Sequence, residues 1–97
     1  MYCVSYNYKL RKGRSVEEFK VWLNNVMPLL ENICGVKYHY VFQPLKSEDE
    51  IVHVVYFIED IKKWREEINS LYINEFVQDL KLITNLPSTE TKYFQEV

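Results

Sequence analysis

The chain has 97 residues, of which 47% are hydrophobic and 15% aromatic, and it contains only two glycines. That length suffices for one core, so we expect residues 1–97 to form a single domain. Dinucleotide fingerprints and phosphate-binding loops need several glycines within one turn, which Gly13 and Gly35 cannot supply. Its 12 basic residues against 14 acidic ones argue against a nucleic-acid or anionic-membrane binder, because such proteins carry a basic excess.

No apolar run approaches the roughly 20 residues of a membrane span, and the N-terminus alternates in polarity rather than resembling a signal peptide. Cys3 and Cys34 lie far apart within apolar segments, which is typical of reduced core thiols in a cytoplasmic protein. A zinc site needs about four ligands in paired spacing, and Cys34, His39 and His53 do not supply them. We therefore expect a cytoplasmic protein with no bound metal.

The first elements are a strand and an amphipathic helix. Residues 2–10 alternate with a period of two, which predicts a strand. Ser15 and Glu18 have the spacing of a capping box, so a helix should begin there, and Gly35 should end it in the left-handed conformation. Pro28 lies inside this helix and predicts a kink or a break near Asn24 and Asn25, because proline lacks an N–H and clashes with the preceding turn.

A hairpin follows the first helix. Residues 36–45 predict a second strand that ends near Pro44, the polar run 46–50 predicts a loop, and residues 51–58 predict a third strand. The third strand is almost entirely apolar instead of alternating, so we expect both of its faces to be buried.

The last elements are a second helix and a polar strand. Asp60 is a candidate N-cap, and apolar residues recur along the following stretch as far as Ile83, with a break expected at Asn69 and Ser70. Pro87 should end this helix. Residues 88–97 predict a final strand, placed at a sheet edge because it is the most polar.

The order β-α-β-β-α-β predicts a ferredoxin-like α+β fold, in which a four-stranded antiparallel sheet carries two helices on one face. The other face would be bare in a monomer, although the third strand is apolar on both sides. Aromatic residues also crowd one parity of the first two strands, namely Tyr2, Tyr6, Tyr8, Tyr38, Tyr40 and Phe42. A second copy of the chain is the simplest cover for such a face, so we expect a homodimer.

The chain resembles the dimeric α+β barrel superfamily. The resemblance rests on this element order, on the step from Gly35 to Val36, and on the segment from Ile51 through Trp64 to Phe76. In that superfamily two such sheets face one another to form a barrel. Its members include antibiotic-biosynthesis monooxygenases, haem-degrading monooxygenases and polyketide cyclases, so the resemblance implies the fold and leaves open whether the protein is an enzyme.

The resemblance to the cofactor-free monooxygenases is carried by an asparagine late in the first strand and a tryptophan early in the second helix, here Asn7 and Trp64. It implies that Asn7 polarises a substrate carbonyl in a pocket between sheet and helices, and that Trp64 binds the substrate at the wall of that pocket. The haem-degrading members carry a histidine after the tryptophan. This chain has no histidine after His53, so we expect neither haem nor another cofactor.

His39 and His53 are the side chains whose ordinary pKa lies nearest neutrality. Polyketide cyclases of this fold resemble the chain in having a histidine in the third strand, which implies that His53 acts as acid or base with Tyr72 as a partner phenol. Tyr6 and His39 complete the expected substrate-binding residues. For each of these side chains, ordinary packing in a strand or core is the alternative interpretation.

We therefore expect a homodimer that resembles cofactor-independent monooxygenases or polyketide cyclases and acts on an aromatic or polyketide-like small molecule. The alternative is a non-catalytic ligand-binding or assembly module of the same fold. A buried cavity of roughly 300 Å³ or more between sheet and helices would favour a ligand, and a filled interior would favour the assembly module.

Overall fold

The computed structural model of the chain describes residues 1–46 and 50–97 and, for residues 71 and 72, the backbone alone. Most of the loop expected over residues 46–50 lies outside the described residues. In chain order the elements are β1 (Tyr2–Lys9), α1 (Val16–Asn32), β2 (Val36–Phe42), β3 (Ile51–Ile58), α2 (Ile61–Glu67), α3 (Leu71–Ile83), the short 3-10 helix η1 (Leu86–Ser88) and β4 (Glu90–Gln95).

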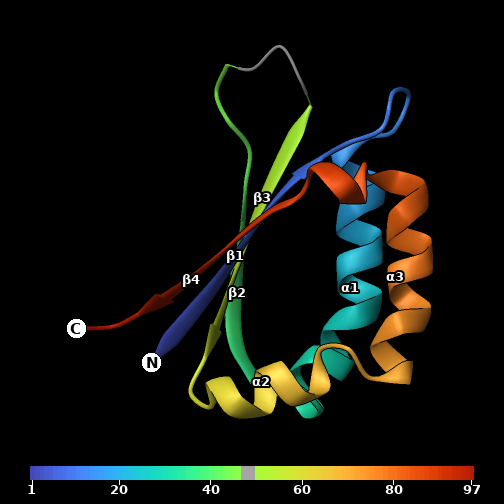
Figure 1. Ribbon diagram of the computed structural model, residues 1–97. Coiled ribbons are helices and arrows are strands. Elements are labelled where there is room, and N and C mark those ends of the chain that lie inside the picture. Colours follow the sequence, from blue (N-terminus) through green and yellow to red (C-terminus); the bar gives the residue numbers. More distant parts are fainter. Residues whose placement is uncertain (47–49) are drawn as a thin grey trace.

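The four strands form one antiparallel sheet in the order β2-β3-β1-β4. Helices α1 and α3 lie side by side on one face of this sheet, and α2 lies across one end (Figure 1). The predicted ferredoxin-like α+β fold is confirmed, as is the edge position of the last strand. No described element covers the second face, which we call the open face.

Helix α1 begins and ends where its sequence predicts. The Ser15 hydroxyl accepts a hydrogen bond from the Glu18 backbone N–H at 3.2 Å, and Gly35 follows the helix with φ +79°, which only glycine adopts without strain. The break expected from Pro28 is absent, because the helix continues through it to Asn32. Pro28 and Asn24 are both exposed, so water can reach the Asn24 carbonyl that proline leaves without a helical donor.

The second helical stretch divides as predicted. The Asp60 carboxylate caps α2 by accepting from the Lys63 N–H at 3.0 Å, and a new helix, α3, starts after Ser70. Pro87 is not the residue that ends it, because α3 stops at Ile83 and Pro87 belongs to η1. The Leu80 carbonyl accepts both the Thr84 backbone N–H, at 2.9 Å, and the Thr84 hydroxyl, at 3.0 Å, so Thr84 closes the last turn of α3.

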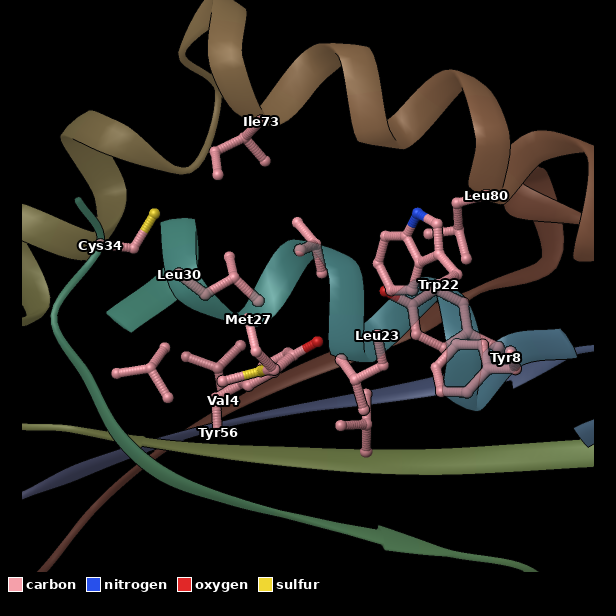
Figure 2. Close-up of a cluster of buried hydrophobic side chains, with 14 of the residues drawn as sticks. Val4, Tyr8, Trp22, Leu23, Met27, Leu30, Cys34, Tyr56, Ile73 and Leu80 are labelled. Carbon is pink, nitrogen blue, oxygen red and sulfur yellow. The ribbon is translucent and has the colours of Figure 1, made fainter. Parts of the chain in front are cut away.

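The core fills the space between the sheet and α1. Figure 2 shows Leu23 and Met27 projecting from α1 toward the strands, while Ile73 and Leu80 project from α3 toward α1. The strands contribute Val4, Val52, Val54 and Ile58, each fully buried.

A bulge in β2 separates the aromatic residues of the first two strands. Val36 pairs with Ile58, but the register shifts before Tyr38, which pairs with Phe57. Tyr2, Tyr6 and Tyr8 of β1 face the helices. The aromatic residues of β2 after the bulge face the other side of the sheet, because the extra residue reverses which side each β2 residue faces. Among the described residues, the large apolar side chains on the open face include Tyr38, Tyr40, Phe42, Ile51, Val55, Phe57 and Phe94.

The expectation that both faces of the third strand are buried is wrong for one face of the single chain. Along β3 the residues alternate strictly between buried and half-buried, and the half-buried set, including His53 and Phe57, lies on the open face. Their neighbours on β1 and β2 shield them only in part.

In the described part of the chain, no helix combines the length and the apolar character needed to cross a bilayer.

Candidate functional site

A cavity of about 210 Å³ lies between the sheet, α1 and α3. Every element that packs on the covered side of the sheet contributes to it. Its described lining consists of Tyr6, Tyr8, Trp22, Val26, Leu30, Tyr56, Trp64, Ile68, Asn69, Ile73, Val77, Leu80, Leu86 and Thr89.

Helical spacing explains how two helices share this cavity. Trp22, Val26 and Leu30 recur every four residues, so they form one row along α1. Ile73, Val77 and Leu80 recur at three and four along α3 and face that row. The two rows approach each other above β1, and the space left between them and the sheet is the cavity.

Aromatic rings close the cavity from the sheet side. The Tyr6 and Tyr8 rings stack with centroids 5.7 Å apart, and the Tyr56 ring meets Tyr6 edge-on at 5.9 Å. The centroid of the Trp64 ring lies 6.5 Å from that of Tyr6 and 5.5 Å from that of Tyr56. These distances are typical of favourable aromatic pairs, so the wall is a fixed surface of ring faces and edges.

The two tryptophans of the lining differ in their hydrogen bonding. The Trp22 indole Nε1–H donates to the Phe76 carbonyl at 2.7 Å. Trp64 is fully buried, and its Nε1–H has no acceptor among the described residues. The Thr89 hydroxyl, also in the lining, is likewise buried without a partner in the described chain. An unpaired buried polar group is costly, so these two groups lower the stability of the described chain relative to one in which each had a partner.

The described lining residues carry no charged side chain. Removal from water is the main cause that raises the pKa of the phenols of Tyr6, Tyr8 and Tyr56, with a smaller contribution from the neighbouring phenols. All three therefore remain neutral in the folded chain at physiological pH, and the cavity is an uncharged, largely apolar environment.

The structure divides the expected site residues between the two faces of the sheet. Tyr6 and Trp64 line the cavity. Asn7 and His53 are paired across β1 and β3 and lie on the open face. The expected direction of Asn7, into a pocket between sheet and helices, is therefore wrong, because its neighbours Tyr6 and Tyr8 face the helices and successive strand residues point to opposite sides.

His53 has a polar environment of its own on the open face. Its Nε2 lies 3.2 Å from the Ser5 hydroxyl, and its ring lies 6.3 Å from the Phe42 ring. The pair forms a hydrogen bond whose direction depends on the histidine tautomer.

His39 and Tyr72 complete the expected set. His39 is half-buried on β2, 6.4 Å from the Tyr56 ring, and is not part of the cavity lining. Tyr72 belongs to α3, and its side chain lies outside the described residues, so the expected pairing of His53 with Tyr72 stays a prediction.

Several lining residues were missed by reasoning from the sequence. Tyr8 lies two residues after Tyr6 in β1, and Tyr56 lies in the buried set of β3, so both face the same side of the sheet as Tyr6. Trp22 lies in the buried row of α1. Periodicity could therefore have placed all three on the covered side. Nothing in the sequence marks Thr89, because it reaches the cavity through the path of η1. Among the described residues, no three or more His, Cys, Asp and Glu side chains gather as a group that could hold a metal ion.

No protein-family model and no curated protein sequence matches the chain. Solved structures do match it in fold. A variant of SnoaB, a cofactor-independent oxygenase from Streptomyces nogalater, superposes with a TM-score of 0.78 at 10% sequence identity, covering 98% of this chain and 91% of SnoaB.

Two further structures share the fold. A candidate antibiotic biosynthesis monooxygenase from Deinococcus radiodurans matches with a TM-score of 0.69 at 11% identity, over 100% of this chain and 93% of that one. A dimeric protein of unknown function and ferredoxin-like fold from Bacteroides fragilis matches with a TM-score of 0.67 at 13% identity, over 98% and 95%. These likenesses confirm the resemblance to monooxygenase-like α+β proteins at the level of the fold.

Proposed function

We propose that this chain forms a homodimer in which each subunit binds an aromatic small molecule in the cavity between sheet and helices. The observation that carries the proposal is the cavity itself, because close-packed interiors rarely leave a space of this size. An apolar wall with a few polar groups is the usual composition of a small-molecule site.

The size of the cavity limits the ligand. Its volume of about 210 Å³ does not reach the roughly 300 Å³ that we expected of a ligand site, although the interior is not filled either. A dry apolar cavity of about 150 Å³ in another protein holds benzene. This cavity therefore suits a molecule of one or two rings.

Filling the cavity tests the binding proposal. Val77 is half-buried in the lining, so Val77→Phe places extra ring atoms in the space that the ligand needs. We expect 2-naphthol to bind the wild type saturably and to bind Val77→Phe at least tenfold more weakly. Val21→Phe adds the same ring on an exposed position of α1 outside the lining and should leave binding unchanged. Absence of saturable binding to the wild type, or equal binding by the folded Val77→Phe variant, would contradict the proposal.

The second candidate function is cofactor-independent oxygenation of the bound molecule. It is favoured by the fold shared with SnoaB and by the position of Trp64 and three tyrosines around one cavity. Without a cofactor, the substrate must supply all the electrons. Conversion of an activated ring methylene to a carbonyl meets this condition, since CH₂ and O₂ yield C=O and H₂O.

Oxygen consumption distinguishes a catalyst from a binder. An enolisable bicyclic ketone such as 2-tetralone, incubated with the protein and a chelator, should consume oxygen faster than in buffer and should retain one atom of labelled dioxygen. Trp64→Phe should lower that rate if the reaction takes place in the cavity. A rate equal to the buffer rate would leave binding as the function.

The homodimer is supported by the composition of the open face. Tyr40 and Phe42 are each 53% exposed there, and Phe94 is 52% exposed. A monomer rarely leaves so many large aromatic side chains on one surface. A structure of the same fold is described as dimeric.

The free thiols Cys3 and Cys34 suit a reducing compartment, which supports a cytoplasmic location.

Asn7 and His53 remain proposed functional residues, but of the dimer rather than of the cavity. If two open faces meet, these side chains and Ser5 lie within the barrel that the two sheets enclose. There His53 could act as an acid or base, as in the cyclase-like interpretation. If turnover takes place in that barrel and not in the cavity, Asn7→Ala and His53→Ala should lower it without changing the affinity of the cavity for 2-naphthol.

A further inference from the structure

The side chains of the open face form rows that run across the sheet, because strand pairing aligns one residue from each strand. Each row takes its residues from β2, β3, β1 and β4, in that order. Row one is Phe42, His53, Asn7 and Glu90, row two is Tyr40, Val55, Ser5 and Lys92, and row three is Tyr38, Phe57, Cys3 and Phe94. Every row begins with an aromatic ring, and rows one and two end in opposite charges on exposed side chains of β4.

A two-fold axis relates the copies in a homodimer, and its position decides which rows meet. Sheets that pack face to face in the aligned manner keep their strands within about 30° of each other. An axis that lies between the two sheets and runs across the strands therefore leaves each strand opposite its own copy, in the reverse direction. Rows at equal distances on either side of this axis then face each other.

The central strands favour an axis between rows one and two. β1 and β3 have their midpoints next to Tyr6 and Val54, which are paired with each other and lie between these two rows. An axis at this level lets both central strands overlap with their copies over nearly their whole length. An axis at row three would instead place Asn7 beyond the end of the copy's β1, and row one would stay uncovered.

The charges on β4 favour the same level. When row one faces row two of the second copy, Glu90 lies opposite Lys92, and the contact occurs twice. The same arrangement brings Phe42 opposite Tyr40, and each of these rings is 53% exposed in the single chain. An axis through row one would place two Glu90 carboxylates opposite each other. An axis through row two would do the same with two Lys92 ammonium groups, and facing like charges oppose association.

We infer that the second copy packs on the open face with its row two against row one, and that Glu90 of each copy forms an ion pair with Lys92 of the other. The inference rests on the proposed homodimer, and it adds the register of the two sheets and the residues that specify it. The aromatic rings supply the apolar contact area. An exposed ion pair adds little affinity, so the two pairs act mainly by excluding registers in which like charges meet.

Charge reversal tests which residues face each other. Glu90→Lys leaves lysine at both positions of one chain, and Lys92→Glu leaves glutamate at both. We expect each variant alone to form homodimers about tenfold more weakly than the wild type, because like charges then meet at both contacts. An equimolar mixture of the two variants should form heterodimers about as tightly as the wild type forms homodimers. Native mass spectrometry with one variant labelled with nitrogen-15 identifies the heterodimer, and sedimentation measures its affinity.

Two further variants are the controls. The double variant Glu90→Lys/Lys92→Glu restores opposite charges at every contact, so it should dimerise as the wild type does and show that the fold tolerates both substitutions. Glu96→Lys makes the same charge change one residue after the end of β4 and outside the two rows. It should dimerise as the wild type does, and it should not rescue the dimerisation of Lys92→Glu.

The outcomes separate this inference from the homodimer on which it rests. A monomeric wild type would overturn both and leave the open face to a different partner. A dimeric wild type whose charge-reversal variants dimerise equally well would keep the homodimer and overturn the register. If the double variant dimerises but the mixture does not, Glu90 and Lys92 act within one chain and the inference fails. Rescue of Lys92→Glu by Glu96→Lys would place the axis at row three, which also overturns the inference.

Discussion

At the scale of single residues, the buried tyrosines explain how one cavity can be aromatic and still uncharged. Tyr8 and Tyr56 are 5% and 2% exposed, and the Tyr6 ring packs against both the Tyr8 and Tyr56 rings. Their rings contribute packing, while burial keeps their hydroxyls protonated. The same burial links the stability of the fold to pH.

The sign of this linkage predicts loss of stability in alkali. A phenol ionises near pH 10 in the unfolded chain, and burial raises the pKa of Tyr6, Tyr8 and Tyr56 in the folded chain. Their contribution is therefore fully present below about pH 10 and is lost as the pH rises above it. Each such group should lower the free energy of unfolding by up to about 1.4 kcal/mol per pH unit in that range.

Urea unfolding between pH 8 and pH 11 measures this effect. Tyr56→Phe removes one buried phenol and should give a shallower alkaline decline than the wild type. A decline of the same slope in the folded Tyr56→Phe variant would show that Tyr56 does not contribute to the pH dependence.

At the scale of the elements, local signals set where α1 and α2 begin and where α1 ends, whereas contacts with distant residues accompany the end of α3. Ser15 and Asp60 accept hydrogen bonds from the backbone three residues later, so α1 and α2 start where the sequence predicts. The end of α3 at Ile83 was not predicted correctly. There the Arg11 side chain donates to the Lys81 and Thr84 carbonyls, 70 and 73 residues away in the sequence, and no local pattern contains such contacts.

The two serine N-caps of α1 and α3 offer a matched comparison. Ser15 makes its capping bond, whereas Ser70 makes none and its hydroxyl is buried without a partner in the described chain. We expect Ser15→Ala to lower the free energy of unfolding by about 1 kcal/mol. Ser70→Ala should be neutral or stabilising by up to about 1 kcal/mol, because it removes an unsatisfied hydroxyl. Equal losses in thermal and urea unfolding of the two variants would contradict this assignment.

Pro28 provides a second prediction about α1. The helix continues through Pro28, and the Pro28 side chain is exposed. Alanine therefore fits at this position and restores a backbone N–H for the Asn24 carbonyl. We expect Pro28→Ala to raise the free energy of unfolding by about 1–3 kcal/mol, less what the unfolded chain gains in freedom when proline is removed. Urea unfolding checks this, and a destabilised variant would mean that the ring itself makes a contact that the helix needs.

At the scale of the whole molecule, the two faces of the sheet differ in what covers them. Helices α1 and α3 cover one face (Figure 1), and the cavity lies there. The other face presents aromatic residues from β2, β3 and β4. The Tyr40 ring contacts Tyr38, Phe42 and Phe57, so it lies at the centre of this aromatic patch.

A charge at the centre of the patch tests the homodimer. We expect the wild type to sediment as a dimer at micromolar concentration and Tyr40→Glu to sediment as a monomer, because pairing would bury two carboxylates without partners. Val21→Glu places the same charge on an exposed position of α1 and should remain a dimer. A monomeric wild type in sedimentation velocity would contradict the proposal.

The sequence by itself determined the element order, the helix caps, the break before α3, and hence the ferredoxin-like fold, because caps and periodicity act over a few residues. The direction of Asn7, the bulge that turns Tyr38 and Tyr40 to the open face, and the arrival of Thr89 at the cavity were decided only by the tertiary structure. These features depend on which strand pairs with which and in what register. A shift of one residue moves a side chain to the other face of the sheet, and local pattern does not encode that shift.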